Sequence, residues 1–312
     1  MAGIIFLSIA LFLRSFLSRE ALNGQEAMPF YNLIFGAIHT LPVLNRVITL
    51  ALLMILGYML IRTGVRNVLL EFRSFMPALF FILFSFAMPE SQQVTPALVG
   101  SVFYLFCFFI LFDAHDKEPD TFSVFTAGLV LALGSMFYLK LIWFIPLIWI
   151  SLGTLRPVTW RELVYPVIAM ALMFLFLFTW YWVVLDNLAG FSGMIRDNLS
   201  FTGSFHPRHY SVYIYYGFCL LLVLIASVYT INRFQTRKTV VQNIYQVMFY
   251  MFVAGILFFL FIARFDPGSL VYIAFPVAMI LSDYFHRKRN PWTHELIMWV
   301  FACLIVFLQL MS

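Results

Sequence analysis

Charged residues are scarce in this chain of 312 residues, where Asp, Glu, Lys and Arg together make up only 11%. In a soluble globular domain about a quarter of the residues are charged and about half are apolar. Here 63% of the residues are hydrophobic and the mean hydropathy is +0.95. A soluble core of this size could not bury so much apolar surface, so the sequence excludes a soluble domain and predicts an integral membrane protein.

Cysteine is also rare, and the histidines do not have the spacing that is typical of metal ligands. Cys107, Cys219 and Cys303 each lie inside an apolar run, so we interpret them as small buried apolar residues. His206 and His209 are close in sequence, but two histidines without a defined carboxylate partner make a weak metal site. The sequence therefore predicts no cofactor, with a divalent metal ion as the alternative.

The long apolar runs that dominate the chain have the length of transmembrane helices, which need roughly 20 residues. We expect an all-α polytopic bundle of about eleven spans, with ten or twelve as alternatives, and a single membrane domain over residues 1–312. Pro146 and Pro276 fall within spans and are expected to kink their helices. The spans are expected near residues 2–17, 41–61, 75–89, 95–112, 122–139, 141–155, 163–185, 210–231, 241–262, 269–285 and 293–311.

Lysine and arginine are distributed unequally between the two sets of alternate loops, with 12 of the 19 in one set and 7 in the other. The positive-inside rule places the richer set and the N-terminus in the cytoplasm of a bacterial inner membrane. The same spread over short loops argues against a nucleic-acid partner, despite the net charge of +5. Residues 1–13 lack the basic start and the small-residue cleavage site of a signal peptide, so they are interpreted as the first span.

Charged side chains are absent from the middle of every predicted span. Ion-coupled transporters commonly place their coupling residues near the midplane, so this absence disfavours such a transporter. Polar residues gather instead in the outer loops near 18–40 and 186–209. Carboxylates and cations there would suit a lipid-linked phosphate substrate, with a carboxylate as general base and basic side chains on the phosphate. The alternative is that these residues are solvated loop charges and ion pairs that anchor the loops.

Three stretches carry a resemblance to a known family. Residues 133–138 read Leu-Gly-Ser-Met-Phe-Tyr, residues 156–162 read Arg-Pro-Val-Thr-Trp-Arg-Glu, and residues 29–33 read Pro-Phe-Tyr-Asn-Leu. Together with Pro146 they resemble an uncharacterised family of multi-pass inner-membrane proteins from Bacteroidota, from the first loop through the seventh span. The resemblance implies a fold and a source but no activity. Physically, residues 156–162 are interpreted as an inner-face turn whose last two residues cap the next span.

A second resemblance is architectural. A first span followed by an outer loop with acidic residues and an interfacial stretch is similar to membrane glycosyltransferases of the polyprenyl-phosphate-sugar (GT-C) class. This resemblance implies Glu26 or Glu20 as the catalytic base. Unlike that class, the loop has two candidate acids in place of one clear motif, and no Asp. The phosphate would be held by basic residues of the later outer loops, Arg196, His206, Arg208 and Arg264.

Three functions follow as alternatives. The first is a GT-C-like glycosyltransferase, or a relative, that acts on a polyprenyl-phosphate sugar at the outer face of the inner membrane. The second is a non-enzymatic membrane subunit of an envelope-biogenesis or secretion complex, which would have a stable protein partner. The third is a transporter or flippase of a lipid-linked substrate. Membrane lipid is a partner in all three.

Overall fold

The computed structural model consists of helices joined by turns, without strands in the part of the chain that it describes. It describes residues 28–36, 41–67, 69, 74–85, 87, 91–113, 121–184, 186–199, 210–232 and 237–287, and single positions between 295 and 307. The first half contains α2 (Pro29–Phe35), α3 (Pro42–Arg66), α4 (Met76–Ser85), α5 (Pro96–Asp113), α6 (Thr121–Ser135), η3 (Leu139–Phe144) and α7 (Ile145–Leu155). The second half contains α8 (Trp160–Thr179), η4 (Trp180–Val184), α9 (Leu188–Leu199), α10 (Tyr210–Asn232), α11 (Thr239–Leu257), η6 (Phe258–Ile262), η7 (Pro267–Ser269) and α12 (Leu270–Arg287).

Six helical segments are long and apolar enough to cross a membrane, and they coincide with six of the predicted spans. They are Pro42–Arg66, Pro96–Asp113, Trp160–Val183, Ile214–Asn232, Thr239–Ile262 and Pro267–His286. Three further predicted spans are shorter apolar helices, Met76–Ser85, Thr121–Ser135 and Leu139–Leu155. The predicted span 2–17 lies outside the described residues, and 293–311 is helical at the few positions described. The protein is therefore a helical membrane protein, while the count of eleven and the cytoplasmic N-terminus stay predictions.

The proline at position 146 does not kink a span, contrary to expectation. The predicted span 141–155 begins as the 3-10 helix η3, and α7 starts at Ile145 with Pro146 in its first turn. A proline is well accommodated there, because the first helical N–H groups have no intrahelical partner. Pro276 does lie inside α12, as predicted, and Pro166 lies inside α8.

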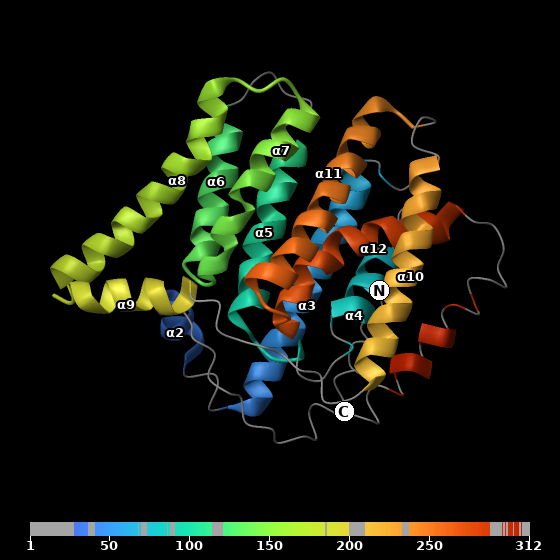
Figure 1. Cartoon of the computed structure of the whole chain (residues 1–312), viewed down its shortest axis with the longest axis horizontal. Coiled ribbons are helices and arrows are strands. Elements are labelled where there is room, and N and C mark those ends of the chain that lie inside the picture. Colours follow the sequence, from blue (N-terminus) through green and yellow to red (C-terminus); the bar gives the residue numbers. More distant parts are fainter. Residues whose placement is uncertain are drawn as a thin grey trace.

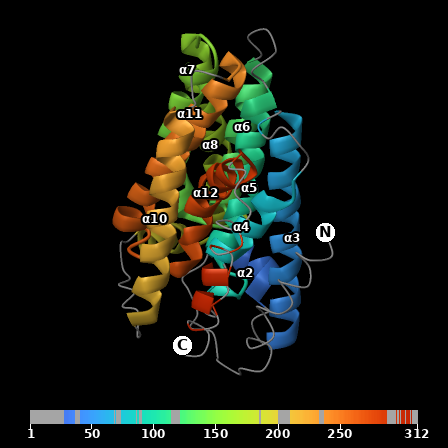
Figure 2. The same ribbon diagram turned by 90° about the vertical axis from the view of Figure 1, so that its right-hand side faces the viewer.

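Most of the long helices run side by side along one axis, but α12 crosses them. Figure 1 shows its ribbon lying across the directions of α10 and α11, and Figure 2 looks nearly along it. It packs against α4, α10 and α11, and its side chains are buried along almost the whole helix. A helix enclosed on all sides can be apolar on all sides, which explains the unbroken apolar run at residues 270–281.

Aromatic side chains form the centre of the bundle, where α5, η3, η6 and α12 meet. Tyr104 and Phe144 lie with ring centroids 4.7 Å apart, and Phe144 and Phe258 are equally close. Tyr272 of α12 approaches Tyr104 edge-on at 5.2 Å. All four side chains are almost fully buried, so part of the phenylalanine and tyrosine content packs helix against helix instead of facing lipid.

Among the described glycines, Gly128 of α6 comes closest to the backbone of a neighbouring helix, α8. A Cβ atom at Gly128 would lie 2.6 Å from the Cα of Pro166, which is closer than real Cβ contacts come. We therefore expect Gly128→Ala to destabilise the protein by about 1–3 kcal/mol through overpacking. The melting temperature of the purified protein in detergent measures this change.

Gly153 of α7 provides the matched control, because a Cβ atom there would meet nothing within 4 Å. Gly153→Ala is expected to leave the stability unchanged or to raise it by up to about 1 kcal/mol, since glycine is unfavourable inside a helix. Equal melting temperatures for the two variants would show that α6 and α8 are not in close contact.

Candidate functional site

The described parts of the two predicted outer loops form short helices at one end of the bundle. Residues 29–35 form α2, and α9 occupies much of 186–209. Figure 1 shows both helices at the end of the molecule where α3 begins. Met28, beside α2, belongs to the same apolar cluster as Phe191 and Met194 of α9 and Leu139 of η3. These segments are therefore packed against the bundle.

The structure describes two of the six side chains of the predicted outer-face site. Arg196 lies exposed in the last turn of α9. Arg264 lies exposed in the turn after η6, with a left-handed backbone at φ 47°. Glu20, Glu26, His206 and Arg208 lie outside the described residues. Convergence of these six residues on one pocket stays a prediction.

Asp266 is a partly buried carboxylate in the same turn as Arg264. Its Oδ1 accepts the N–H of Gly268 at 3.2 Å and so caps η7. Burial raises the pKa of this carboxyl, while the Gly268 N–H and the positive charge of Lys140 act in the opposite direction. Asp266 therefore caps η7 directly before α12 and lies near the positive charge of Lys140. Among the described residues, no group of three or more His, Cys, Asp and Glu side chains could hold a metal ion.

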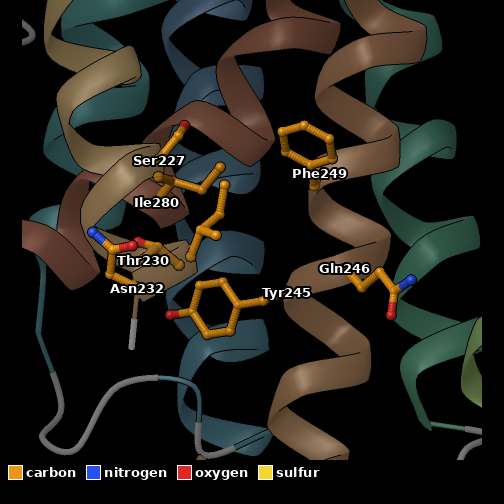
Figure 3. A pocket seen from close by; sticks show the side chains of 8 residues that line it. Ser227, Thr230, Asn232, Tyr245, Gln246, Phe249 and Ile280 are labelled. Atoms are coloured by element: carbon orange, nitrogen blue, oxygen red, sulfur yellow. The ribbon is translucent and has the colours of Figure 1, made fainter. Parts of the chain in front are cut away.

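A cavity of about 630 Å³ lies between α10 and α11, with α12 behind it. We call it the α10–α11 crevice. Figure 3 shows Tyr245 reaching from α11 toward α10, whereas Gln246 points away from the gap. The crevice opens on the apolar surface, because Ile231 and Phe249 at its edge are 58% and 41% exposed. Its lining residues are Ser227, Thr230, Ile231, Asn232, Tyr245, Gln246, Phe249 and Ile280.

Two hydroxyls in the wall of the crevice lack the hydrogen bond that helical hydroxyls usually make. The side-chain oxygens of Ser227 and Thr230 are buried and have no hydrogen-bond partner, and Thr230 is only 6% exposed. Ser85 of α4 shares this property but is not among the lining residues. Other helical hydroxyls donate to the carbonyl four residues earlier, as do Thr49, Thr63, Ser151, Thr154, Thr179 and Ser282. Both oxygens are inaccessible to solvent, so they lie behind the surface of the wall and do not face the open space of the crevice.

A buried ion pair lies behind one end of the crevice. The guanidinium of Arg237 is paired with the carboxylate of Asp283, and both side chains are almost inaccessible to solvent. The ring of Tyr245, which lines the crevice, lies 4.2 Å from the Cζ of Arg237. Gln242 donates to the carbonyl of Arg237 at 2.9 Å. These contacts fasten the start of α11 to α12.

Reasoning from the sequence missed the crevice. Arg237 is one of the 19 lysines and arginines whose distribution between the loops was used to predict the topology, and Ser227 and Thr230 fall inside a predicted span that is mostly apolar. One signal was present, because Asp283 lies inside the predicted span 269–285. A carboxylate within a membrane span requires a nearby cation as its partner. The sequence does not show which lysine or arginine is that partner.

The residue run 156–162 is a second buried ion-pair site, and its details differ from expectation. Glu162 caps α8, as predicted, in a capping box with Thr159. Its Oε1 also accepts Nη2 of Arg156 at 2.6 Å, and Glu162 is completely buried. Arg161 was expected to share the capping role but is exposed. The first arginine of the run, not the second, therefore balances the carboxylate.

Comparison with known proteins places the chain in a family. The model of DUF6427, described as a family of unknown function, matches residues 5–312. The match extends well beyond the part of the chain over which a resemblance was expected. No curated protein and no solved structure matches the chain.

Proposed function

The chain belongs to DUF6427, a family of unknown function, and we propose that it binds a membrane lipid in the α10–α11 crevice. The observation that carries the proposal is a cavity of about 630 Å³ that opens on the apolar surface between Ile231 and Phe249. None of the eight residues that line it is charged. Such a lining fits the uncharged part of an amphiphile, with its chain against Phe249 and Ile280.

The bilayer itself supplies the ligand. A cavity that opens sideways into lipid fills with acyl chains, because hydrocarbon is the solvent there. Transfer of a chain from bilayer to crevice gains no hydrophobic free energy, since lipid tails are as apolar as the side chains. Packing against the lining side chains therefore decides which lipid stays.

Lipid binding is common to the functions that the sequence suggests. A glycosyltransferase that uses a polyprenyl-phosphate sugar and a flippase of a lipid-linked substrate both hold a lipid between helices. The positive-inside rule puts the connection between α10 and α11 in the cytoplasm and the α2 end outside. The crevice would then be reached from the inner leaflet, at the opposite end from Glu20 and Glu26. A glycosyltransferase site at those residues would be separate from the crevice.

Photo-crosslinking tests the crevice directly. The full-length protein is reconstituted with a phospholipid that carries a diazirine in its acyl chain, and labelled peptides are mapped by mass spectrometry. We expect labelling of the segments that contain Thr230, Phe249 and Ile280. Ser227→Phe fills the crevice and is expected to reduce this labelling at least fivefold.

Val228→Phe is the matched control, because Val228 is the next residue of α10 and is 58% exposed outside the crevice. It adds the same ring to the same helix and is expected to leave the crevice labelling unchanged. Labelling of the three segments that is equal in Ser227→Phe and wild type would exclude an acyl chain in the crevice.

A further inference from the structure

Two exposed arginines near the end of α3 lie against one phenylalanine ring of α5. The Cζ atom of Arg62 is 5.3 Å from the centroid of the Phe109 ring, and the Cζ atom of Arg66 is 5.2 Å from it. Arg66 is also paired with the carboxylate of Asp113, the last residue of α5, so α3 and α5 end side by side. The ring therefore gathers two guanidinium groups at the surface, where cation–π contacts are favourable.

The charges of this group do not balance. Asp113 is the counter-charge of Arg66, whereas Arg62 forms no ion pair in the part of the chain that the structure describes. The ring of Phe109 offers no acceptor oxygen, so the N–H donors of Arg62 remain available to an anion. A phosphate fits these donors well, because its oxygens can accept two parallel hydrogen bonds from one guanidinium.

Apolar side chains continue from Arg62 along both helices. Ile55 and Tyr58 lie on the same face of α3 as Arg62 and are 48% and 53% exposed. On α5, Phe106 is 44% exposed, and its ring is nearly parallel to that of Phe109. We call these five residues the α3–α5 surface. It combines a positive end with a surface that hydrocarbon can cover, which is the pattern of an anionic amphiphile.

The depth of Arg62 in a bilayer suits a lipid phosphate. Helix α3 comprises 25 residues, so it is about 37 Å long, compared with about 30 Å for the hydrocarbon core. If the helix is centred, the Cα of Arg66 lies about 4 Å outside the core and the Cα of Arg62 about 2 Å inside it. An arginine so close to the boundary extends its long stem to place the guanidinium among the headgroups.

We propose that Arg62, with Arg66 beside it, binds the phosphate of an anionic phospholipid whose acyl chains cover the apolar part of the α3–α5 surface. The guanidinium of Arg62 donates hydrogen bonds to the phosphate oxygens, and Asp113 holds Arg66 in place next to it. A zwitterionic lipid brings its own cation to the same level, so the anionic lipid is preferred. Figure 2 shows α3 and α10 on opposite sides of the bundle, so this site is separate from the α10–α11 crevice and does not rest on lipid binding there.

Lipid titration with charge variants tests the site. The full-length protein in detergent is titrated with phosphatidylglycerol and with phosphatidylcholine of the same acyl chains, and bound lipid is counted by native mass spectrometry. We expect wild type to prefer phosphatidylglycerol, and Arg62→Gln to bind it about fivefold more weakly, as expected for one basic side chain near a membrane surface. Asp113→Asn releases Arg66 from its counter-charge and should strengthen phosphatidylglycerol binding about fivefold. Binding of phosphatidylcholine should change in neither variant.

Arg161→Gln is the matched control, because it removes the same charge from an exposed position, and none of the described aromatic rings contacts Arg161. It should keep the preference for phosphatidylglycerol. Equal losses in Arg161→Gln and Arg62→Gln would overturn the site, since binding would then follow net charge alone. Equal binding of the two lipids by wild type would overturn it as well.

Two further measurements separate this site from other sources of binding. Ser227→Phe, which fills the crevice, should leave the preference for phosphatidylglycerol unchanged. A loss in that variant would place the anionic lipid in the crevice, and would overturn the α3–α5 site without affecting the proposed function. Glycerol phosphate, which has no acyl chains, should not displace phosphatidylglycerol at equal concentration. Displacement would show that the arginines bind a soluble phosphate instead of a lipid.

Discussion

Replacement of Asp283 by alanine is expected to destabilise the protein by about 3–5 kcal/mol. The variant leaves the guanidinium of Arg237 buried without its counter-charge, and Nε and Nη1 of that side chain have no hydrogen-bond partner even in the native protein. Thermal unfolding in detergent should show a fall in melting temperature of roughly 10 °C. Because the pair holds α11 against α12, lipid binding in the crevice should weaken as well.

Two comparisons isolate the cause of this loss. The double variant Arg237→Leu with Asp283→Leu removes both charges and should recover most of the stability, since an apolar pair can replace a buried ion pair. Asp113→Ala breaks the ion pair with Arg66, which is considerably more exposed, and should cost no more than about 1 kcal/mol. If Asp113→Ala and Asp283→Ala lower the melting temperature equally, the Arg237 pair is not buried in the folded protein.

The second large loss of stability is expected when Glu162 is replaced by alanine. One carboxylate accepts the backbone N–H of Thr159 at 3.0 Å and Nη2 of Arg156 at 2.6 Å, and it is fully buried. Its loss removes one of the two hydrogen bonds of the capping box of α8 and the ion pair with Arg156, so we expect a loss of about 3–5 kcal/mol. Glu162→Gln should lose less, because the amide oxygen can still accept the Thr159 N–H.

Arg161 supplies the control for this prediction, because it precedes Glu162 directly and is exposed. Arg161→Ala should change the stability by no more than about 0.5 kcal/mol. A loss for Arg161→Ala as large as that for Glu162→Ala would mean that Arg161 caps the helix, as the sequence alone suggested. Melting curves of the two variants and wild type, in one detergent, decide between these outcomes.

Much of the helix content was predictable, because span length and hydropathy are local properties. The spans near 41–61, 95–112, 163–185 and 241–262 coincide with long apolar helices. The stretch 141–155 was predicted less well, since a proline within an apolar run is compatible with a kinked helix or with a new helix start. Only the turn at residues 136–138 and the 3-10 helix η3 show that α7 begins at Ile145.

The candidate site was less predictable than the helices. The sequence directed attention to outer-loop charges, and of those residues the structure describes Arg196 and Arg264, both exposed. The crevice depends on Ser227, Thr230 and Tyr245, which are ordinary components of apolar spans. They matter because they line the gap between α10 and α11, and the position of that gap is not encoded by residue type or spacing.

The sequence by itself determined that this is an integral membrane protein, because the apolar content and the length of the apolar runs decide whether a helix is more stable in lipid or in water. It also determined that charges stay near helix ends, since an ion in hydrocarbon is costly wherever its helix packs. Only the tertiary structure decided that α12 crosses the other helices, which arginine meets which carboxylate, and which aromatic rings pack inward. Lipid and neighbouring helices are equally apolar, so a phenylalanine or a serine in a span does not reveal what it faces until the helices are packed together.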